Sequence, residues 1–267
     1  MMIYQDFAGV YDELMDNTPY ALWADRLELL IRKYGVSRPE RDAEEVLDAE
    51  RNLVVDLGCG TGTLTELMYL KGYDMIGVDA SESMLNIAME KKEKSGSEIL
   101  YLQQDMRELE LYGTVGTIFS VCDSLNYILD EDELLEVFSL VNNYLFPGGI
   151  FIFDFNTDHK YRDIIGETTI AENREDCSFI WENFYDPEEE INEYDLTVFV
   201  RAEGDTFRRF TETHFQRGYT VEQMLALVGR AGMSVVEVLD ADTGEAVTDR
   251  SQRVYVIAKE KEKDRSF

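Results

Sequence analysis

The sequence predicts an α/β protein with a doubly wound, mostly parallel sheet of seven strands and an inserted antiparallel β-sheet. Three observations predict this architecture. Short apolar runs alternate with amphipathic helical stretches through the first part of the chain. The first apolar run passes directly into a glycine-rich turn and a helix. About sixty residues rich in β-forming types then separate the fifth predicted strand from the last predicted helix.

The N-terminal part of the chain contains an aromatic and acidic segment over residues 4–15, followed by an amphipathic helix. Pro19 suits the first turn of this helix, which extends to Tyr34 and ends at Gly35. Residues 36–51 are highly charged. We expect them to form an exposed excursion or an extra helical turn that contains no site.

A buried strand is predicted over residues 53–57, and the glycine-rich turn follows it directly. Gly58, Gly60 and Gly62 allow positive φ angles and let a ligand approach the main chain closely. The helix that follows adds unpaired N–H groups at the same place. The turn is therefore a candidate ligand site, and a tight turn without a ligand is the alternative.

The residues around the glycines distinguish two classes of ligand. A dinucleotide site favours glycine at position 63, where this chain has Thr63. Asp56 precedes the first glycine by two residues, which is unfavourable for a pyrophosphate and favourable for a cationic ligand. A nicotinamide-dependent oxidoreductase is disfavoured for the same two reasons.

Acids follow the next two predicted strands. The strand over residues 75–79 lies one helix downstream of the first, as a right-handed βαβ unit requires, and the strand over 99–104 runs into Asp105. Ligands of open parallel sheets bind outside the carboxyl ends of the strands. Asp79 is therefore placed to accept hydrogen bonds from both hydroxyls of a ribose, and capping of the helix over 81–94 is its alternative role.

A fourth strand over residues 116–121 and a fifth over 150–155 complete the parallel part of the sheet. The helix over 130–145 between them begins with four acids, which suit its positive end. We expect the Pro-Gly-Gly at 147–149 to end this helix and to lead into the fifth strand.

The insertion follows the fifth strand, and the closing helix and two strands come after it. Three antiparallel strands are predicted inside it, over residues 178–185, 194–201 and 206–219. The closing elements are predicted at 221–231, 234–239 and 253–258.

These elements predict how the chain divides. Residues 1–165 and 219–267 form the ligand-binding domain, and residues 166–218 form an antiparallel β cover over the site of the second substrate. The reason is that the fifth strand ends at the ligand-binding edge, so the insertion leaves from the rim of the site.

The chain resembles the class I (Rossmann-like) methyltransferases that use S-adenosylmethionine (SAM). Within them it is similar to nucleotide-sugar N,N-dimethyltransferases and related bacterial small-molecule methyltransferases. The stretches that carry the resemblance are residues 7–12, 54–62, 104–107, 147–149 and 210–214. The acidic tract 182–195 and the 36–51 excursion are not features of that family.

The resemblance implies SAM as the cofactor and a set of residues that bind it. It implies that Asp105 takes the exocyclic amine of adenine, that the backbone N–H of Met106 takes a ring nitrogen, and that Cys122 forms a small wall. The alternatives are a loop acid at Asp105 and core packing at Met84 and Trp23. The expected cofactor-binding residues are Tyr11, Trp23, Asp56, Gly58, Cys59, Gly60, Gly62, Asp79, Ala80, Met84, Asp105, Met106 and Cys122.

Methyl transfer is an in-line displacement at a carbon that is already activated by positive sulfur, so no nucleophilic side chain is required. An amine acceptor must arrive neutral, and a hydroxyl acceptor needs a base. Tyr11, Asn126 and His214 are candidates for assisting the acceptor, and each has a packing role as its alternative. The sequence leaves the catalytic residue open.

The composition excludes several classes of function. The formal net charge of −30 disfavours nucleic acids and anionic membranes, whose phosphates need clustered Lys and Arg. No apolar run reaches the length of about 18 residues that suits a membrane span, and the N-terminus lacks signal-peptide regions. Three cysteines without C-x-x-C spacing and only two histidines predict a reducing cytoplasm, no disulfide framework and no metal site.

We therefore expect a cytoplasmic SAM-dependent methyltransferase, monomeric or homodimeric, that acts on an amine or hydroxyl of a small molecule. A non-catalytic SAM-binding regulatory or assembly protein is the alternative from another class. RNA is the alternative acceptor, and the charge balance disfavours it. The sequence leaves open the acceptor's identity and the choice between N-, O- and C-methylation.

Overall fold

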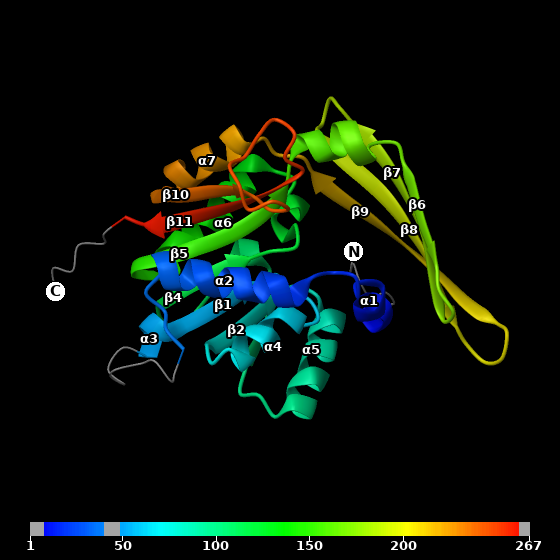
Figure 1. Ribbon diagram of the computed structural model, residues 1–267, viewed down its shortest axis with the longest axis horizontal. Helices are drawn as coiled ribbons and strands as arrows, with labels where there is room; N and C mark the ends of the chain where they lie inside the picture. The colour runs from blue at the N-terminus through cyan, green and yellow to red at the C-terminus, as the bar shows by residue number, and fades with distance from the viewer. Residues whose placement is uncertain (1–7, 40–48, 262–267) are drawn as a thin grey trace.

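The computed structural model describes residues 8–39 and 49–261, and it contains a central sheet between two layers of helices (Figure 1). The strands lie in the order β10-β11-β5-β4-β1-β2-β3, and β11 runs antiparallel to both of its neighbours. Their bounds are β1 Leu53–Leu57, β2 Asp74–Asp79, β3 Leu100–Gln103, β4 Val115–Ser120, β5 Leu145–Asn156, β10 Met233–Asp240 and β11 Arg253–Glu260. The predicted doubly wound, seven-stranded fold is confirmed.

The helices divide between the two faces of this sheet. One face packs on α2 and α4, with α5 beside α4, and the other face packs on α6 and α7. The bounds are α1 Ala8–Leu14, α2 Tyr20–Tyr34, α3 Ala49–Asn52, α4 Thr63–Leu70, α5 Glu82–Ser95, α6 Glu131–Tyr144 and α7 Val221–Arg230. The inner strands β1, β4, β5 and β11 are therefore buried on both faces, as the continuous apolar runs in the sequence predict, and the edge strands β3 and β10 are partly exposed.

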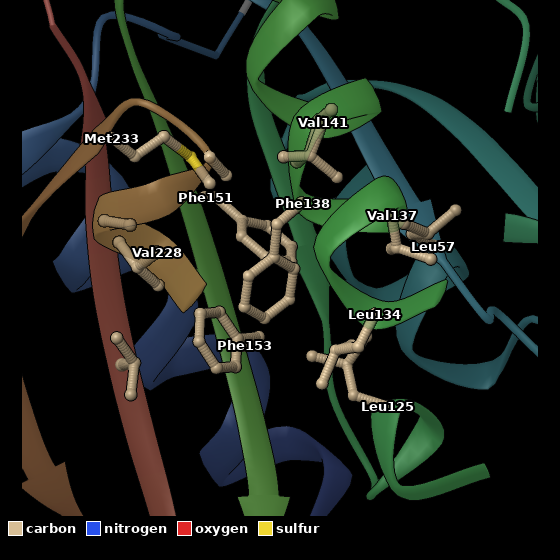
Figure 2. Packing of buried hydrophobic residues seen from close by; sticks show 14 of the residues in the cluster. Leu57, Leu125, Leu134, Val137, Phe138, Val141, Phe151, Phe153, Val228 and Met233 are labelled. Carbon is tan, nitrogen blue, oxygen red and sulfur yellow. The ribbon is translucent and has the colours of Figure 1, made fainter. Parts of the chain in front are cut away.

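The core between α6 and the sheet is organised around Phe138 (Figure 2). Phe138 is fully buried, and its ring lies 5.6 Å from that of Phe151 and 5.1 Å from that of Phe153. Residues spaced three and four apart on α6 face the sheet because they share one side of a helix. These positions are Leu134, Val137, Phe138 and Val141.

The junction of α6 and β5 differs from the prediction. α6 ends at Tyr144, and β5 begins at Leu145 rather than at residue 150, because Leu145 already pairs with Val115. Pairing then resumes with Ile150 opposite Thr117. The Pro-Gly-Gly therefore lies in an irregularity within the strand rather than in a loop before it.

The insertion forms a second sheet of four antiparallel strands, which we call the inserted sheet, in the order β6-β7-β8-β9. Their bounds are β6 Thr169–Asn173, β7 Cys177–Asp186, β8 Ile191–Arg201 and β9 Phe207–Arg217. The prediction of three strands was wrong because it missed β6. This strand is short and mostly exposed, so it has no apolar alternation to signal it. A short π-helical turn, η5 (Lys160–Ile165), connects β5 to the inserted sheet.

The short helix α1 packs between α5 and the inserted sheet (Figure 1). Ala8 and Val10 of α1 contact a cluster that contains Met84 of α5 and Leu196 and Val198 of β8. The N-terminal segment is therefore helical where the structure describes it. Residues 4–7 of that expected segment and residues 40–48 of the expected excursion lie outside the described residues.

We expect Phe138→Ala to lower the free energy of unfolding by about 3–5 kcal/mol, because it removes a large buried ring and leaves a cavity between α6 and β5. Urea unfolding followed by circular dichroism measures this change. Leu22→Ala on α2 is the control, because Leu22 is 68% exposed and its loss should cost no more than about 0.5 kcal/mol. Equal losses in the two variants would contradict this account of the core.

Candidate active site

A cavity of about 600 Å³ opens at the carboxyl ends of β1, β2, β3 and β4. The glycine turn (residues 58–62), the segments after β2 and β3, and the segment after β4 form most of its wall. Tyr11, Tyr20 and Phe215 complete the wall from α1, α2 and β9. The cavity therefore lies at the edge of the sheet where open α/β folds bind their ligands.

The main chain of the glycine turn forms one side of the cavity. The N–H groups of Gly58 and Cys59 donate to the carbonyl of Val78, at 2.7 and 3.0 Å. Gly58 has φ +83°, and a Cβ on it would lie 2.8 Å from Oγ of Ser124. Gly60 has φ +53°, and a Cβ there would meet nothing within 4 Å. The turn therefore needs glycine at 58 for packing, and at 60 its backbone faces open space.

Asp79 connects the end of β2 to this turn. Its Oδ2 accepts the N–H of Gly60 at 2.8 Å, and its Oδ1 accepts the N–H of Ser81 at 2.8 Å. Burial raises the pKa of Asp79, and these backbone hydrogen bonds oppose that rise. Ser81, rather than Asp79, caps α5, because its Oγ accepts the N–H of Met84 at 3.3 Å. Asp79 lines the cavity, and a carboxylate has more acceptor sites than its backbone donors Gly60, Ser81 and Ala80 occupy.

Asp56 is a second carboxylate at the cavity, and it is 3% exposed. Its Oδ2 accepts the hydroxyl of Thr65 on α4 at 2.6 Å. Burial raises the pKa of Asp56 to about 7, and the neighbouring charge of Asp79 adds to the rise. This carboxyl group therefore changes its charge near neutral pH and responds strongly to a nearby cation.

Asp105 reaches the cavity from the segment after β3. Arg107 binds its two oxygens, with Nη2 2.6 Å from Oδ2 and Nε 3.0 Å from Oδ1. The hydrogen bonds from Arg107 hold the pKa of Asp105 below its ordinary value. Asp105 is therefore ionised at neutral pH, and Arg107 is held in place by Glu133 on α6 at 3.0 Å.

An ion pair and two hydroxyl groups hold α1 against the glycine turn. Asp12 accepts hydrogen bonds from the hydroxyls of Thr61, at 2.6 Å, and Thr63, at 3.1 Å. Lys91 of α5 forms an ion pair with Asp12 at 2.6 Å. These contacts position Tyr11 at the cavity, and Asp12 was not among the predicted site residues.

The opposite wall contains Cys122, which has a φ angle of +68°, and the next residue, Asp123, has a φ angle of +54°. Such angles are unfavourable for side chains other than glycine, so the surroundings must hold them. The N–H of Asp123 donates to the buried carboxylate of Asp154 at 2.8 Å, and Arg253 forms ion pairs with both aspartates. Burial, reinforced by Asp123, raises the pKa of the Cys122 thiol to about 12, so this wall is neutral.

The structure brings most of the predicted site residues to one cavity. Those that line it are Tyr11, Asp56, Gly58, Cys59, Gly60, Asp79, Ala80, Met84, Asp105, Met106 and Cys122. Four predicted residues lie elsewhere. These are Trp23, Gly62, Asn126 and His214.

Each of the four has a packing or hydrogen-bonding reason for its position. Trp23 packs on Tyr20, at 5.6 Å between ring centroids, and beneath the guanidinium of Arg253. A Cβ on Gly62 would meet the side chain of Tyr101. The Asn126 amide donates to the carbonyls of Asn156 and Arg217, at 2.9 and 2.7 Å, and joins β5 to β9. His214 lies behind Tyr127, whose ring lines the cavity.

Tyr20 and Tyr127 also line the cavity, and neither was among the predicted site residues. Tyr20 follows Pro19 at the start of α2, and Tyr127 ends a short 3-10 helix, η4 (Ser124–Tyr127), after β4. Tyr127 directly follows Asn126, which the sequence predicted as a candidate for assisting the acceptor. The signal was therefore in the right segment, but the choice between neighbours depends on the phase of the short helix.

Comparison with known proteins agrees with this geometry. Residues 54–149 match a family model described as a methyltransferase domain. The chain is 33% identical over 258 residues to a protein of Geobacillus sp. (strain WCH70) that is named as a methyltransferase. The match covers 97% of this chain and 100% of that protein. The chain belongs to the methyltransferase family.

Two solved structures extend the comparison. A S-adenosylmethionine-dependent methyltransferase from Clostridium acetobutylicum ATCC 824 superposes with a TM-score of 0.82 at 28% identity, over 96% of this chain and 98% of that one. SAM-bound CalS10, an amino pentose methyltransferase from Micromonospora echinaspora, superposes with a TM-score of 0.70 at 16% identity, over 98% and 99%. The second likeness concerns the fold alone. The protein is thus a SAM-dependent methyltransferase with the Rossmann-like fold of its class.

The predicted absence of a membrane span can be compared with the helices that the structure describes. Within residues 8–39 and 49–261 no helix of the methyltransferase has the length and apolar character needed to cross a bilayer.

We expect Asp56→Asn to change how stability depends on pH. Burial raises the pKa of Asp56 from 3.8 to about 7, so the folded protein holds a proton that the unfolded chain releases. The stability contributed by this proton is complete below about pH 4 and is lost as the pH rises through about 7. The wild type should therefore lose stability relative to the variant over this range, by about 1.4 kcal/mol for each unit of pKa difference.

Urea unfolding of both proteins without cofactor, at intervals from pH 4 to pH 8, measures this difference. Asp205→Asn is the control, because the Asp205 side chain is fully exposed and should leave the pH profile unchanged. Parallel profiles for Asp56→Asn and the wild type would show that Asp56 titrates normally.

Proposed function

We propose that this methyltransferase binds SAM in the cavity beside the glycine turn and methylates an amine or hydroxyl of a small-molecule acceptor. The observation that carries the proposal is the position of Asp79. Its carboxylate is fixed by the N–H groups of Gly60 and Ser81 at the end of β2, and the residue lines the cavity. A ribose with two neighbouring hydroxyls suits such a carboxylate.

The residues present fit the rest of the cofactor. Gly60 leaves open space where any other residue would place a side chain, so a ligand can reach the main chain. Asp56, whose pKa burial raises to about 7, supplies a negative charge for an ammonium group beside the turn. Asp105 and the N–H of Met106 are assigned to the adenine, with Met84 and Cys122 as apolar walls.

SAM, when bound, supplies a methyl carbon that is already activated by positive sulfur. The protein's contribution is to orient the two reactants and to exclude water, which in comparable reactions supplies roughly 7–11 kcal/mol. We assign Tyr11 to the wall between cofactor and acceptor, because α1 holds it against the cavity. Trp23, Gly62 and Asn126 act in this proposal through packing rather than through ligand contact.

We propose that residues 166–218 act as the cover of the acceptor site, and that residues 1–165 and 219–267 form the SAM-binding domain. Two observations support this division. Phe215 of β9 lines the cavity. The inner face of β8 and β9 contacts η4 through Tyr194 and His214, which both reach the hydroxyl of Tyr127. A sheet in this position excludes water from the transferring group.

A small molecule is the acceptor that the charge balance favours. The net charge of −30 repels the phosphates of RNA, and the cavity wall contains Asp56, Asp79, Glu82 and Asp105 against Arg107. The name of CalS10 gives an amino pentose as one acceptor that this fold accommodates.

Cys59, Cys122 and Cys177 are free thiols, which supports a reducing compartment such as the cytoplasm.

We expect Asp79→Ala to weaken SAM binding about tenfold or more, which corresponds to about 1.4 kcal/mol per tenfold change. The variant loses the ribose acceptor and the bond that holds Gly60. Isothermal titration calorimetry with SAM and S-adenosylhomocysteine measures the change. Asp74→Ala, at the exposed start of the same strand, is the matched control and should bind as the wild type does. Unchanged affinity in Asp79→Ala would remove this assignment.

The acceptor class is tested with methyl-labelled SAM and a panel of amino sugars, alkyl and aromatic amines, sugar hydroxyls, phenols and an RNA transcript. We expect label in at least one small amine or hydroxyl compound and none in RNA, because the anionic surface repels phosphates. Label in RNA, or SAM binding without transfer to any member, would contradict the proposal.

A further inference from the structure

A chain of polar groups runs from the cavity wall into the inserted sheet. The hydroxyl of Tyr127 lies 2.6 Å from the hydroxyl of Tyr194 and 3.2 Å from Nδ1 of His214. Nε2 of His214 lies 3.4 Å from a carboxylate oxygen of Glu212. We call these four residues the Tyr127–His214 array. Of the four, only Tyr127 lines the cavity.

His214 and Tyr194 of the array are buried. His214 is 1% exposed, and its ring stacks on that of Tyr194 at 4.8 Å with an angle of 11° between the planes. The ring of Trp181 lies 5.0 Å from that of Tyr194 on the side of β7. An imidazole held in this way keeps one orientation, which a proton acceptor requires.

Strand pairing explains how the sequence assembles the array. Tyr194 of β8 is directly opposite His214 of β9, so the two side chains share one face of the sheet. Glu212 is two residues before His214 on the same strand and therefore points to the same face. η4 then brings Tyr127 onto that face from the parallel sheet.

We propose that Tyr127 is a catalytic residue that accepts the acceptor's proton and passes its own proton to Nδ1 of His214. This inference rests on the proposed function. In the step, the acceptor's nitrogen or oxygen forms a bond to the methyl carbon, and the carbon–sulfur bond breaks with its electron pair on sulfur. The acceptor's N–H or O–H proton moves to the oxygen of Tyr127, and the phenolic proton of Tyr127 moves to His214. A neutral amine attacks with its lone pair and releases its N–H proton along this route, and a hydroxyl releases its O–H proton as its oxygen attacks.

The hydrogen bonds define the other roles. Nδ1 of His214 must be unprotonated to accept the hydroxyl of Tyr127, so the ring proton is on Nε2. Nε2 makes no hydrogen bond, but Glu212 lies 3.4 Å from it and is close enough to stabilise the imidazolium by its charge. The Tyr127 hydroxyl has a single proton. When it donates this proton to His214, its oxygen accepts a hydrogen bond from the hydroxyl of Tyr194. Tyr127, Tyr194 and Glu212 are titratable groups that lie near His214.

Nitrogen NMR tests the hydrogen bonding without any acceptor. The chain has two histidines, and His159→Gln leaves His214 as the single imidazole. In long-range ¹H–¹⁵N spectra of this background, we expect His214 as the Nε2–H tautomer. We expect Tyr127→Phe to shift the Nδ1 resonance. The Nδ1–H tautomer in the parent, or a spectrum unchanged by Tyr127→Phe, would overturn the proposal.

Kinetics with an acceptor from the panel tests the proton transfer. We expect Tyr127→Phe to lower kcat about 100-fold or more, and His214→Gln to lower it by a similar factor. The double variant should be no slower than the slower single variant, because the two residues act as a unit. SAM affinity should stay within about threefold of the wild type, since neither residue is assigned to the cofactor.

Tyr112→Phe is the matched control, because Tyr112 is fully exposed and should leave kcat unchanged. A kcat of Tyr127→Phe within about threefold of the wild type, or a loss that appears only in SAM affinity, would overturn the catalytic role. A panel without any acceptor would remove the proposed function and the proton transfer with it. Normal turnover in Tyr127→Phe would remove the proton transfer alone.

Discussion

The hydrogen bond between the Asp79 carboxylate and the N–H of Gly60 is the interaction on which the site depends. A buried carboxylate is costly unless main-chain or side-chain donors satisfy it, and here the N–H groups of Gly60 and Ser81 do so. The same bond fixes the glycine turn in a positive-φ conformation in which no side chain enters the cavity. The strand end and the turn therefore hold each other, and the space between them stays open for a ligand.

A second constraint lies on the opposite wall, where Arg253 of β11 binds Asp123 and Asp154. Asp154 is fully buried, so its charge is tolerated only because it is paired and accepts the N–H of Asp123. This network holds Cys122 and Asp123 in left-handed backbone conformations at the start of η4. The last strand of the chain thus sets the direction in which η4 presents Tyr127 to the cavity.

The parallel fold and the glycine turn could be predicted because their signals are local: apolar runs, glycines at alternate positions and acids at strand ends. The features that depend on tertiary packing could not be predicted. In a 3-10 helix, neighbouring residues point a third of a turn apart, and only packing against β5 and β9 turns Asn126 inward and Tyr127 outward. The edge strand β6 was not predicted because its mostly exposed residues show no apolar alternation. Tyr20, rather than Trp23, faces the cavity because α2 directs Trp23 toward Arg253.

The distribution of charge around the cavity suits transfer from a cation. Positive charge on sulfur disappears as the methyl group leaves, so a carboxylate beside the sulfur would stabilise the ground state more than the transition state. In the proposed arrangement the acids at the strand ends meet the ammonium, the ribose and the adenine. The wall at Cys122 is neutral because burial raises its thiol pKa to about 12. The proton released by the acceptor then leaves in the other direction, through Tyr127 into the inserted sheet, where Glu212 faces the imidazole that receives it.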